Sequence, residues 1–182
     1  MDANDRTKER LAKSVKTLMI NKSLDKITVK EIADQCELTR QTFYRYFQDK
    51  YDLVNWCFDK LAQQSFKLRG VSLTLEEGLI QKFTFVKEEK DFFSAAFKSR
   101  DCNSLFDYDL KLITEFYTNR IMEKTGKPLD SHSKFLLEMY CLGSMDMTFK
   151  WIGEGMKMEP KEIADLLIDA IPERLKNVLL LM

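Results

Sequence analysis

The stretch from Ile27 to Leu53 constrains the fold more than any other part of the chain. Thr28 and Glu31 have the spacing of a capping box, which starts a helix. Apolar residues then recur at helical spacing, at Val29, Ile32, Ala33 and Cys36. Residues 35–38 predict a tight turn, and Thr39 is a good N-cap for a second helix. The stretch therefore predicts two short helices joined by a turn.

The second of these helices has two contrasting faces. Phe43 and Phe47 lie one turn apart and are expected to face inward together with Leu38. The residues left to face outward are polar or basic: Arg40, Gln41, Thr42, Tyr44 and Arg45. A helix that hides two Phe rings and exposes such side chains is suited to the major groove of DNA.

The exposed residue types predict particular contacts with DNA. Arg40 and Arg45 can each donate two hydrogen bonds to guanine O6 and N7, and Gln41 can pair with adenine N6 and N7. Thr42 lies on the same face. Phosphate contacts, which set position but not sequence, are expected from further polar side chains. These are Thr28, Thr39, Tyr44, Tyr46 and Lys50.

Three consecutive motifs, ITVKEIA, LTRQTFYRYF and DKYDL, resemble the TetR family of bacterial transcription regulators. The second motif follows the family's pattern of Thr, an apolar residue, Tyr, any residue, His or Tyr, and Phe, and Lys50 supplies the basic residue that usually follows. The resemblance covers about the first third of the chain. Glu37 departs from it, because the family often has Gly at this turn position, where φ is commonly positive. WIGEGMKMEPKEIADLL also resembles the end of the C-terminal region of a Firmicutes-type subgroup.

Composition favours an all-α protein. The chain has 182 residues, 45% of them hydrophobic, with only three Pro and six Gly. The pattern predicts about nine helices: a three-helix head at residues 1–50, carrying the helix-turn-helix, and a larger helical body at residues 51–182 for effector sensing and dimerisation. Breaks are expected at residues 70–72, 126–128 and 153–155, and Pro172 is expected to kink or restart the last helix.

Two long segments near the C-terminus, 131–152 and 161–181, carry more apolar residues than one helix face needs. Such helices must be covered on most sides. Packing inside one chain is one solution. The family resemblance implies another, in which these helices pair with those of a second copy to form a homodimer. The interface residues expected in that case are Met139, Leu142, Gly143, Ile163, Leu167 and Ile171.

Aromatic residues in the body raise the possibility of an apolar effector pocket. The candidates are Phe83, Phe93, Phe97, Phe116, Tyr117, Tyr140 and Trp151. The same residues also suit an ordinary helical core. In relatives of this type the effector can be a small molecule or a partner protein, and the residues do not separate the two.

Other function classes find little support in the chain. His132 is the sole His, and no metal-ligand spacing, nucleophile–base arrangement or phosphate-binding loop is present, so no enzyme activity, cofactor or metal is predicted. The four Cys residues (36, 57, 102 and 141) are widely spaced, as expected for thiols in a reducing cytoplasm. No apolar run reaches membrane-spanning length. Formal net charge is zero. Residues 39–50 carry three basic residues against one acidic residue, and this small local excess suits a modest number of phosphate contacts.

These observations predict a cytoplasmic, homodimeric regulator that binds a near-palindromic double-stranded DNA operator, one half-site per subunit. Repression that is released by an effector is the expected mode, as the resemblance implies. The effector would act by its differential affinity for two states of the dimer. The alternative is a regulator or adaptor whose body binds a protein co-regulator in place of a small molecule.

Overall fold

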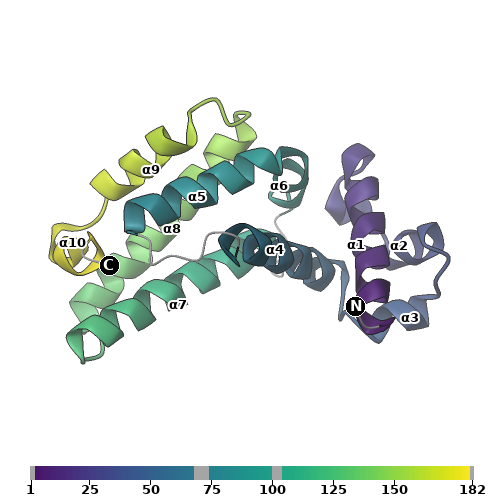
Figure 1. Cartoon of the computed structure of the whole chain (residues 1–182), viewed down its shortest axis with the longest axis horizontal. Coiled ribbons are helices and arrows are strands. Elements are labelled where there is room, and N and C mark those ends of the chain that lie inside the picture. The colour runs from purple at the N-terminus through teal and green to yellow at the C-terminus, as the bar shows by residue number, and fades with distance from the viewer. Residues whose placement is uncertain (1–2, 68–73, 100–103, 181–182) are drawn as a thin grey trace. The chain divides into compact units, whose positions relative to one another are not determined.

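The computed structural model describes residues 3–67, 74–99 and 104–180. Within these ranges the fold is all-helical, with ten α-helices, one short 3-10 helix and no strand (Figure 1). In chain order the elements are α1 (Ala3–Asn21), η1 (Leu24–Lys26), α2 (Val29–Gln35), α3 (Arg40–Tyr44), α4 (Lys50–Lys67), α5 (Leu75–Glu88), α6 (Lys90–Ala96), α7 (Leu105–Thr125), α8 (Ser131–Gly153), α9 (Pro160–Asp169) and α10 (Glu173–Leu180).

The all-α prediction is confirmed, and the count exceeds the expected nine because Pro172 separates α9 from α10. Ala170 closes α9, and Leu175 N donates to Pro172 O as α10 begins. Two predicted breaks have local causes, since Gly126 and Gly155 adopt positive φ. The break expected at residues 70–72, and Cys102, lie outside the described residues. No helix of the described ranges is long and apolar enough to cross a membrane.

The chain divides into two compact units. The head unit comprises residues 1–64 and 91–107, and the body unit comprises residues 65–90 and 108–182. The predicted head ended at residue 50, where α4 begins, whereas the compact head unit continues along α4 and also takes in most of α6. The helix-turn-helix therefore belongs to a unit assembled from two separate stretches of sequence.

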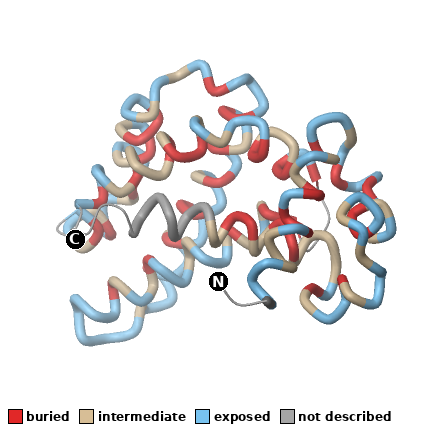
Figure 2. The backbone as a smooth tube through the Cα atoms, turned by 45° about the vertical axis from the view of Figure 1, so that its right-hand side comes forward, coloured by how far each residue is buried: buried red, intermediate tan, exposed pale blue. Residues whose placement is uncertain are grey.

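Apolar side chains of α1 and α2 form the first part of the head unit's core. Leu11, Val15 and Met19 follow one face of α1 and are buried, as are Ile32 and Ala33 of α2. Ser14 Oγ, also buried, donates a 2.7 Å hydrogen bond to Ile32 O and links the two helices. Figure 2 shows this alternation of buried and exposed positions along the helices.

Aromatic residues of α6 complete that core. Phe93 is fully buried and meets Phe58 of α4 edge to face, with ring centroids 6.1 Å apart. Phe92 is buried beside it, and Lys16 Nζ of α1 lies 5.1 Å from its ring centroid. Burying an aromatic ring is among the largest single contributions to a core. Helix α1 thus contacts a ring far along the chain, since Lys16 and Phe92 are 76 positions apart.

In the body unit α5 packs along α9 (Figure 1). Thr74 and Glu77 form a capping box that starts α5. Phe83 meets Trp151 of α8 edge to face at 5.4 Å, and Tyr140 donates a hydrogen bond to Leu167 O of α9. These contacts bury one face of α8 inside the chain.

Replacing Phe93 by Ala should lower the free energy of unfolding by about 3–5 kcal/mol, because it removes a fully buried ring and leaves a cavity. Phe116→Ala is the matched control: Phe116 is 53% exposed, so its loss should cost only about 1 kcal/mol. Urea unfolding of both variants would measure the difference. Equal costs would contradict a role for α6 in the core.

Candidate nucleic-acid interface

The capping box predicted for α2 is present. Thr28 Oγ1 accepts a hydrogen bond from Glu31 N at 3.2 Å, and Glu31 Oε2 accepts one from Thr28 N at 2.9 Å. Lys22 Nζ lies 2.6 Å from Glu31 Oε1. The hydrogen bond from Lys22, followed by those from Thr28, lowers the pKa of Glu31 to about 2. The side chains of Lys22, Thr28 and Glu31 therefore fix the first turn of α2.

The turn between α2 and α3 is a Schellman motif. Leu38 N donates to Ala33 O at 2.9 Å and Glu37 N to Asp34 O at 3.1 Å. Glu37 has φ of 54°, the positive value that the sequence predicted at the position where the family often has Gly. Arg10 Nη2 of α1 donates to Cys36 O and satisfies a carbonyl at the end of α2. The turn is therefore stabilised by its own backbone hydrogen bonds and by a side chain from α1.

Helix α3 is short and is held by its cap and by two Phe rings. Thr39 Oγ1 accepts from Thr42 N at 3.1 Å, as expected of an N-cap. Phe43 is fully buried and Phe47 is 4% exposed, with ring centroids 5.8 Å apart. The regular helix ends at Tyr44, earlier than the pattern to Phe47 suggests, and Arg45 forms the C-cap.

The side chains of α3 that are expected to contact DNA lie on the exposed side of this motif. Arg40, Gln41, Tyr44 and Arg45 are exposed. Thr42 is half-buried, and its hydroxyl lies 2.9 Å from that of Thr39. The buried rings of Phe43 and Phe47 hold the backbone from which these side chains project. The arrangement can present two guanidinium groups and an amide to base edges.

Several predicted phosphate-contacting side chains also hold the head together. Tyr46 Oη donates to Asn4 Oδ1 of α1 at 3.1 Å. Lys50 Nζ donates to Asp25 O at 2.8 Å and Ile27 O at 2.9 Å. Thr28 and Thr39 act as N-caps. Sequence reasoning predicted the capping roles of Thr28 and Thr39. It did not detect the structural roles of Tyr46 and Lys50, because their three bonds join residues more than 20 positions apart.

The seven aromatic candidates for an effector pocket are divided between the units. Phe93 and Phe97 lie in the head unit, stacked on each other at 5.8 Å. In the body unit Phe83 packs on Trp151, and Tyr117 lies 6.1 Å from Tyr140. Burial raises the pKa of both Tyr117 and Tyr140, the latter to about 12. Phe116 is largely exposed. Except for Phe116 these rings pack as core.

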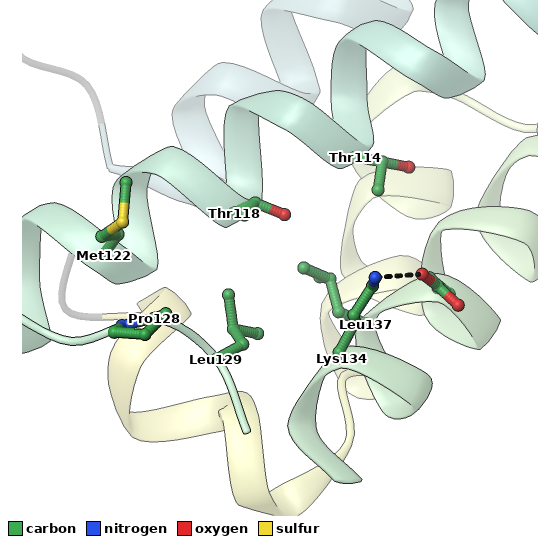
Figure 3. A pocket seen from close by; sticks show the side chains of 8 residues that line it. Thr114, Thr118, Met122, Pro128, Leu129, Lys134 and Leu137 are labelled. Carbon is green, nitrogen blue, oxygen red and sulfur yellow. Dashed lines mark ion pairs between the residues drawn. The ribbon is translucent and has the colours of Figure 1, made fainter. Parts of the chain in front are cut away.

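A cavity of about 250 Å³ lies between α7 and α8 in the body unit (Figure 3). It is lined by Thr114, Thr118, Met122, Pro128, Leu129, Lys134, Leu137 and Glu138. Thr118 and Leu129 extend into it, and Lys134 and Glu138 form an ion pair at its edge. None of the seven aromatic candidates lines it. Its threonines and aliphatic residues resemble ordinary helix surface in the sequence, which gave no signal for it.

The six residues predicted at a dimer interface fall into two groups. Met139, Leu142 and Gly143 are exposed on α8, and Met139 and Leu142 are each more than half exposed. In contrast, Ile163 and Leu167 of α9, which packs against α5, are buried within the single chain. Ile171, just after α9, is also buried. The neighbouring exposed apolar residues are Phe135 of α8 and Leu166 of α9. Because the second group is already buried within one chain, its side chains are not available on the surface to contact a second copy.

A rigid helix-turn-helix with a basic, hydrogen-bonding exposed face defines a DNA-binding regulator. Comparison with known families agrees. Residues 16–56 match the family described as bacterial regulatory proteins, tetR family, and residues 74–173, more than half of the chain, match its transcriptional regulator C-terminal region. The chain belongs to the TetR family of transcription regulators. Within the described residues no cluster of His, Cys, Asp or Glu is arranged to hold a metal ion.

Individual relatives extend this comparison. The HTH-type dhaKLM operon transcriptional activator DhaS of Lactococcus lactis subsp. lactis (strain IL1403) is 38% identical over 53 residues, which span 29% of this chain and only 28% of that protein. Among solved structures, the dihydroxyacetone kinase operon activator DhaS superposes with a TM-score of 0.62 at 20% identity, covering 94% of this chain and 97% of that one. A tetR-family regulator from Streptomyces coelicolor gives 0.58 at 17% identity, covering 93% and 80%. At these identities the structural likeness shows the fold alone.

Glu37→Gly should raise the free energy of unfolding by about 0.5–1 kcal/mol, because relief of left-handed strain outweighs the added freedom of the unfolded chain. Glu37→Ala, which keeps a Cβ, should give no such gain. Chemical denaturation of the three proteins would measure both effects. A gain of equal size in the Ala variant would assign the effect to the lost charge.

The stability of the head should depend on the charge of Glu31. Its pKa is lower in the folded protein than the ordinary 4.5, so the ionised form stabilises the fold. This contribution is complete above about pH 4.5 and is lost as pH falls toward about 2. The difference in unfolding free energy between the native protein and Glu31→Gln should therefore shrink over that interval. A difference that stays constant with pH would exclude the capping-box charge as its source.

Proposed function

We propose that the protein binds a near-palindromic operator as a homodimer, with Arg40, Gln41 and Arg45 reading base edges and Tyr44 with Thr42 at the adjoining backbone. The observation that carries this proposal is the exposure of these side chains on a helix whose other face is anchored by Phe43. Four further residues would contact phosphates in addition to forming hydrogen bonds that stabilise the head: Thr28, Thr39, Tyr46 and Lys50. Phosphate contacts from such groups set the register on the duplex.

The dimer is supported by the exposed face of α8. Phe135, Met139 and Leu142 lie at successive helical spacings, each about half exposed or more, and Gly143 beside them lets another backbone approach. Leu166 of α9 is similarly exposed. We propose that these residues form the interface, in place of Ile163, Leu167 and Ile171, which the chain buries itself. A two-fold dimer would then present two heads to two half-sites.

For the mode of regulation, the first proposal is repression that is released by an effector. Activation is the second, because the relative from Lactococcus lactis is named a transcriptional activator. The cavity between α7 and α8 offers a small effector an apolar floor with hydroxyl groups and a charged pair at its edge. A protein co-regulator that binds the body remains the alternative, and a stoichiometric partner that copurifies with the regulator would favour it.

Arg40→Ala and Arg45→Ala should each weaken operator binding by about 1–3 kcal/mol and relax the preference at one base pair. Purified protein would first select fragments from genomic DNA, and fluorescence anisotropy on an enriched fragment would then give the dissociation constants. Arg120→Ala, which removes the same side chain from α7 in the body, should leave affinity unchanged. If both head variants bind as tightly as the native protein, these arginines do not read the operator.

Met139→Glu should convert the dimer to a monomer and abolish tight operator binding, since it places a charge twice in a two-fold apolar interface. Sedimentation velocity would measure the oligomeric state. Met122→Glu is the matched control, because Met122 is comparably exposed but lies on α7. A dimer that survives Met139→Glu but not Met122→Glu would move the interface to α7.

A further inference from the structure

Asp25 in η1 joins three segments of the head unit. Its Oδ1 accepts a hydrogen bond from Tyr51 Oη at 3.1 Å and another from Ser99 Oγ at 2.5 Å. Its backbone O accepts from Lys50 Nζ. Tyr51 and Lys50 begin α4, whereas Ser99 lies after α6, 74 residues along the chain. One exposed residue therefore connects η1 to the start of α4 and to the segment that follows α6.

Ser99 is well placed to act as an anchor. It is 1% exposed, and its backbone N donates to Ala96 O at the end of α6. The preceding helix is fixed in turn, because Phe92, Phe93 and Phe97 are all buried. A hydroxyl held in this way has little freedom to lose when it bonds to a carboxylate, and hydrogen bonds to charged acceptors are the stronger kind.

The consequences of this bond reach the helix-turn-helix. Ile27 follows η1, is buried, and has its carbonyl bound by the same Lys50 ammonium that binds Asp25 O. Thr28, the next residue, is the N-cap of α2. The position of Asp25 thus affects where α2 starts. Because the Schellman turn fixes α3 relative to α2, a shift of α2 would also move α3.

We propose that Ser99 is a positioning residue for DNA binding: through Asp25 it holds the N-terminal end of the helix-turn-helix in the geometry that fits the operator. This inference rests on the proposed function but assigns part of it to a residue far outside the DNA-reading motif. The head would read DNA in full only while the segment at residues 91–99 stays packed against it.

The test compares two serines. Ser99→Ala removes the bond to Asp25. Ser104→Ala is the matched control, because Ser104 belongs to the same unit, is equally buried and bonds to a different carboxylate, Asp107 Oδ2, at 3.1 Å. In the full-length protein Ser99→Ala should weaken operator binding about fivefold, and Ser104→Ala less than about twofold. Asp25→Asn should weaken binding similarly, and its combination with Ser99→Ala should be less than additive.

Amide hydrogen exchange without DNA gives a second readout. Residues 29–35 of α2 should exchange faster in Ser99→Ala than in Ser104→Ala or the native protein. Equal operator affinity and equal exchange in the two Ala variants would overturn the inference and leave the proposed function intact. If the native protein selects no DNA sequence, the proposed function fails, and the exchange comparison still decides whether Ser99 positions α2.

Discussion

Burial of Phe43 is the constraint on which the exposed face of the helix-turn-helix depends. Helix α3 has five residues, too few to be stable by its own hydrogen bonds. Its conformation comes from the Thr39 cap at one end and from Phe43 and Phe47, which pack into the core. Because successive residues of a helix point about 100° apart, fixing Phe43 inward turns Gln41, two residues earlier, to the opposite face. Arg40, in the first turn, and Tyr44, at the last residue of the helix, are also exposed.

The features that the sequence predicted correctly in the head are local. The capping box, the turn with positive φ at Glu37 and the Thr39 cap each involve residues within five positions of one another. Their geometry follows from short-range hydrogen bonding and from which residues tolerate a left-handed backbone. The inward pair of Phe residues was predictable for the same reason, since helical periodicity needs no knowledge of what the helix packs against.

Features that join distant parts of the chain were beyond that reasoning. The place of α6 in the head core depends on Phe93 meeting Phe58, and the Asp25–Ser99 bond spans 74 positions. In the body, helices rich in apolar residues gave no sign of which side faced inward. The structure turns Tyr140 and Cys141 of α8 inward and leaves Met139 and Leu142 outside. Aromatic content alone did not separate a pocket from a core, because both require apolar surface.

Some polar side chains of the head form structural hydrogen bonds, whereas others are exposed. This difference matters for how a regulator of this kind acquires a preference for a new operator sequence. Thr28, Thr39, Tyr46 and Lys50 are tied to the backbone or to α1, so replacing any of them alters the shape of the motif. Arg40, Gln41 and Arg45 are exposed, and the fold is held by residues behind them. In the proposed binding mode, substitution at these three positions therefore exchanges base contacts while the backbone that presents them stays the same. The side chains proposed to set the sequence preference are then different from those that stabilise the head, which lets one property change without the other.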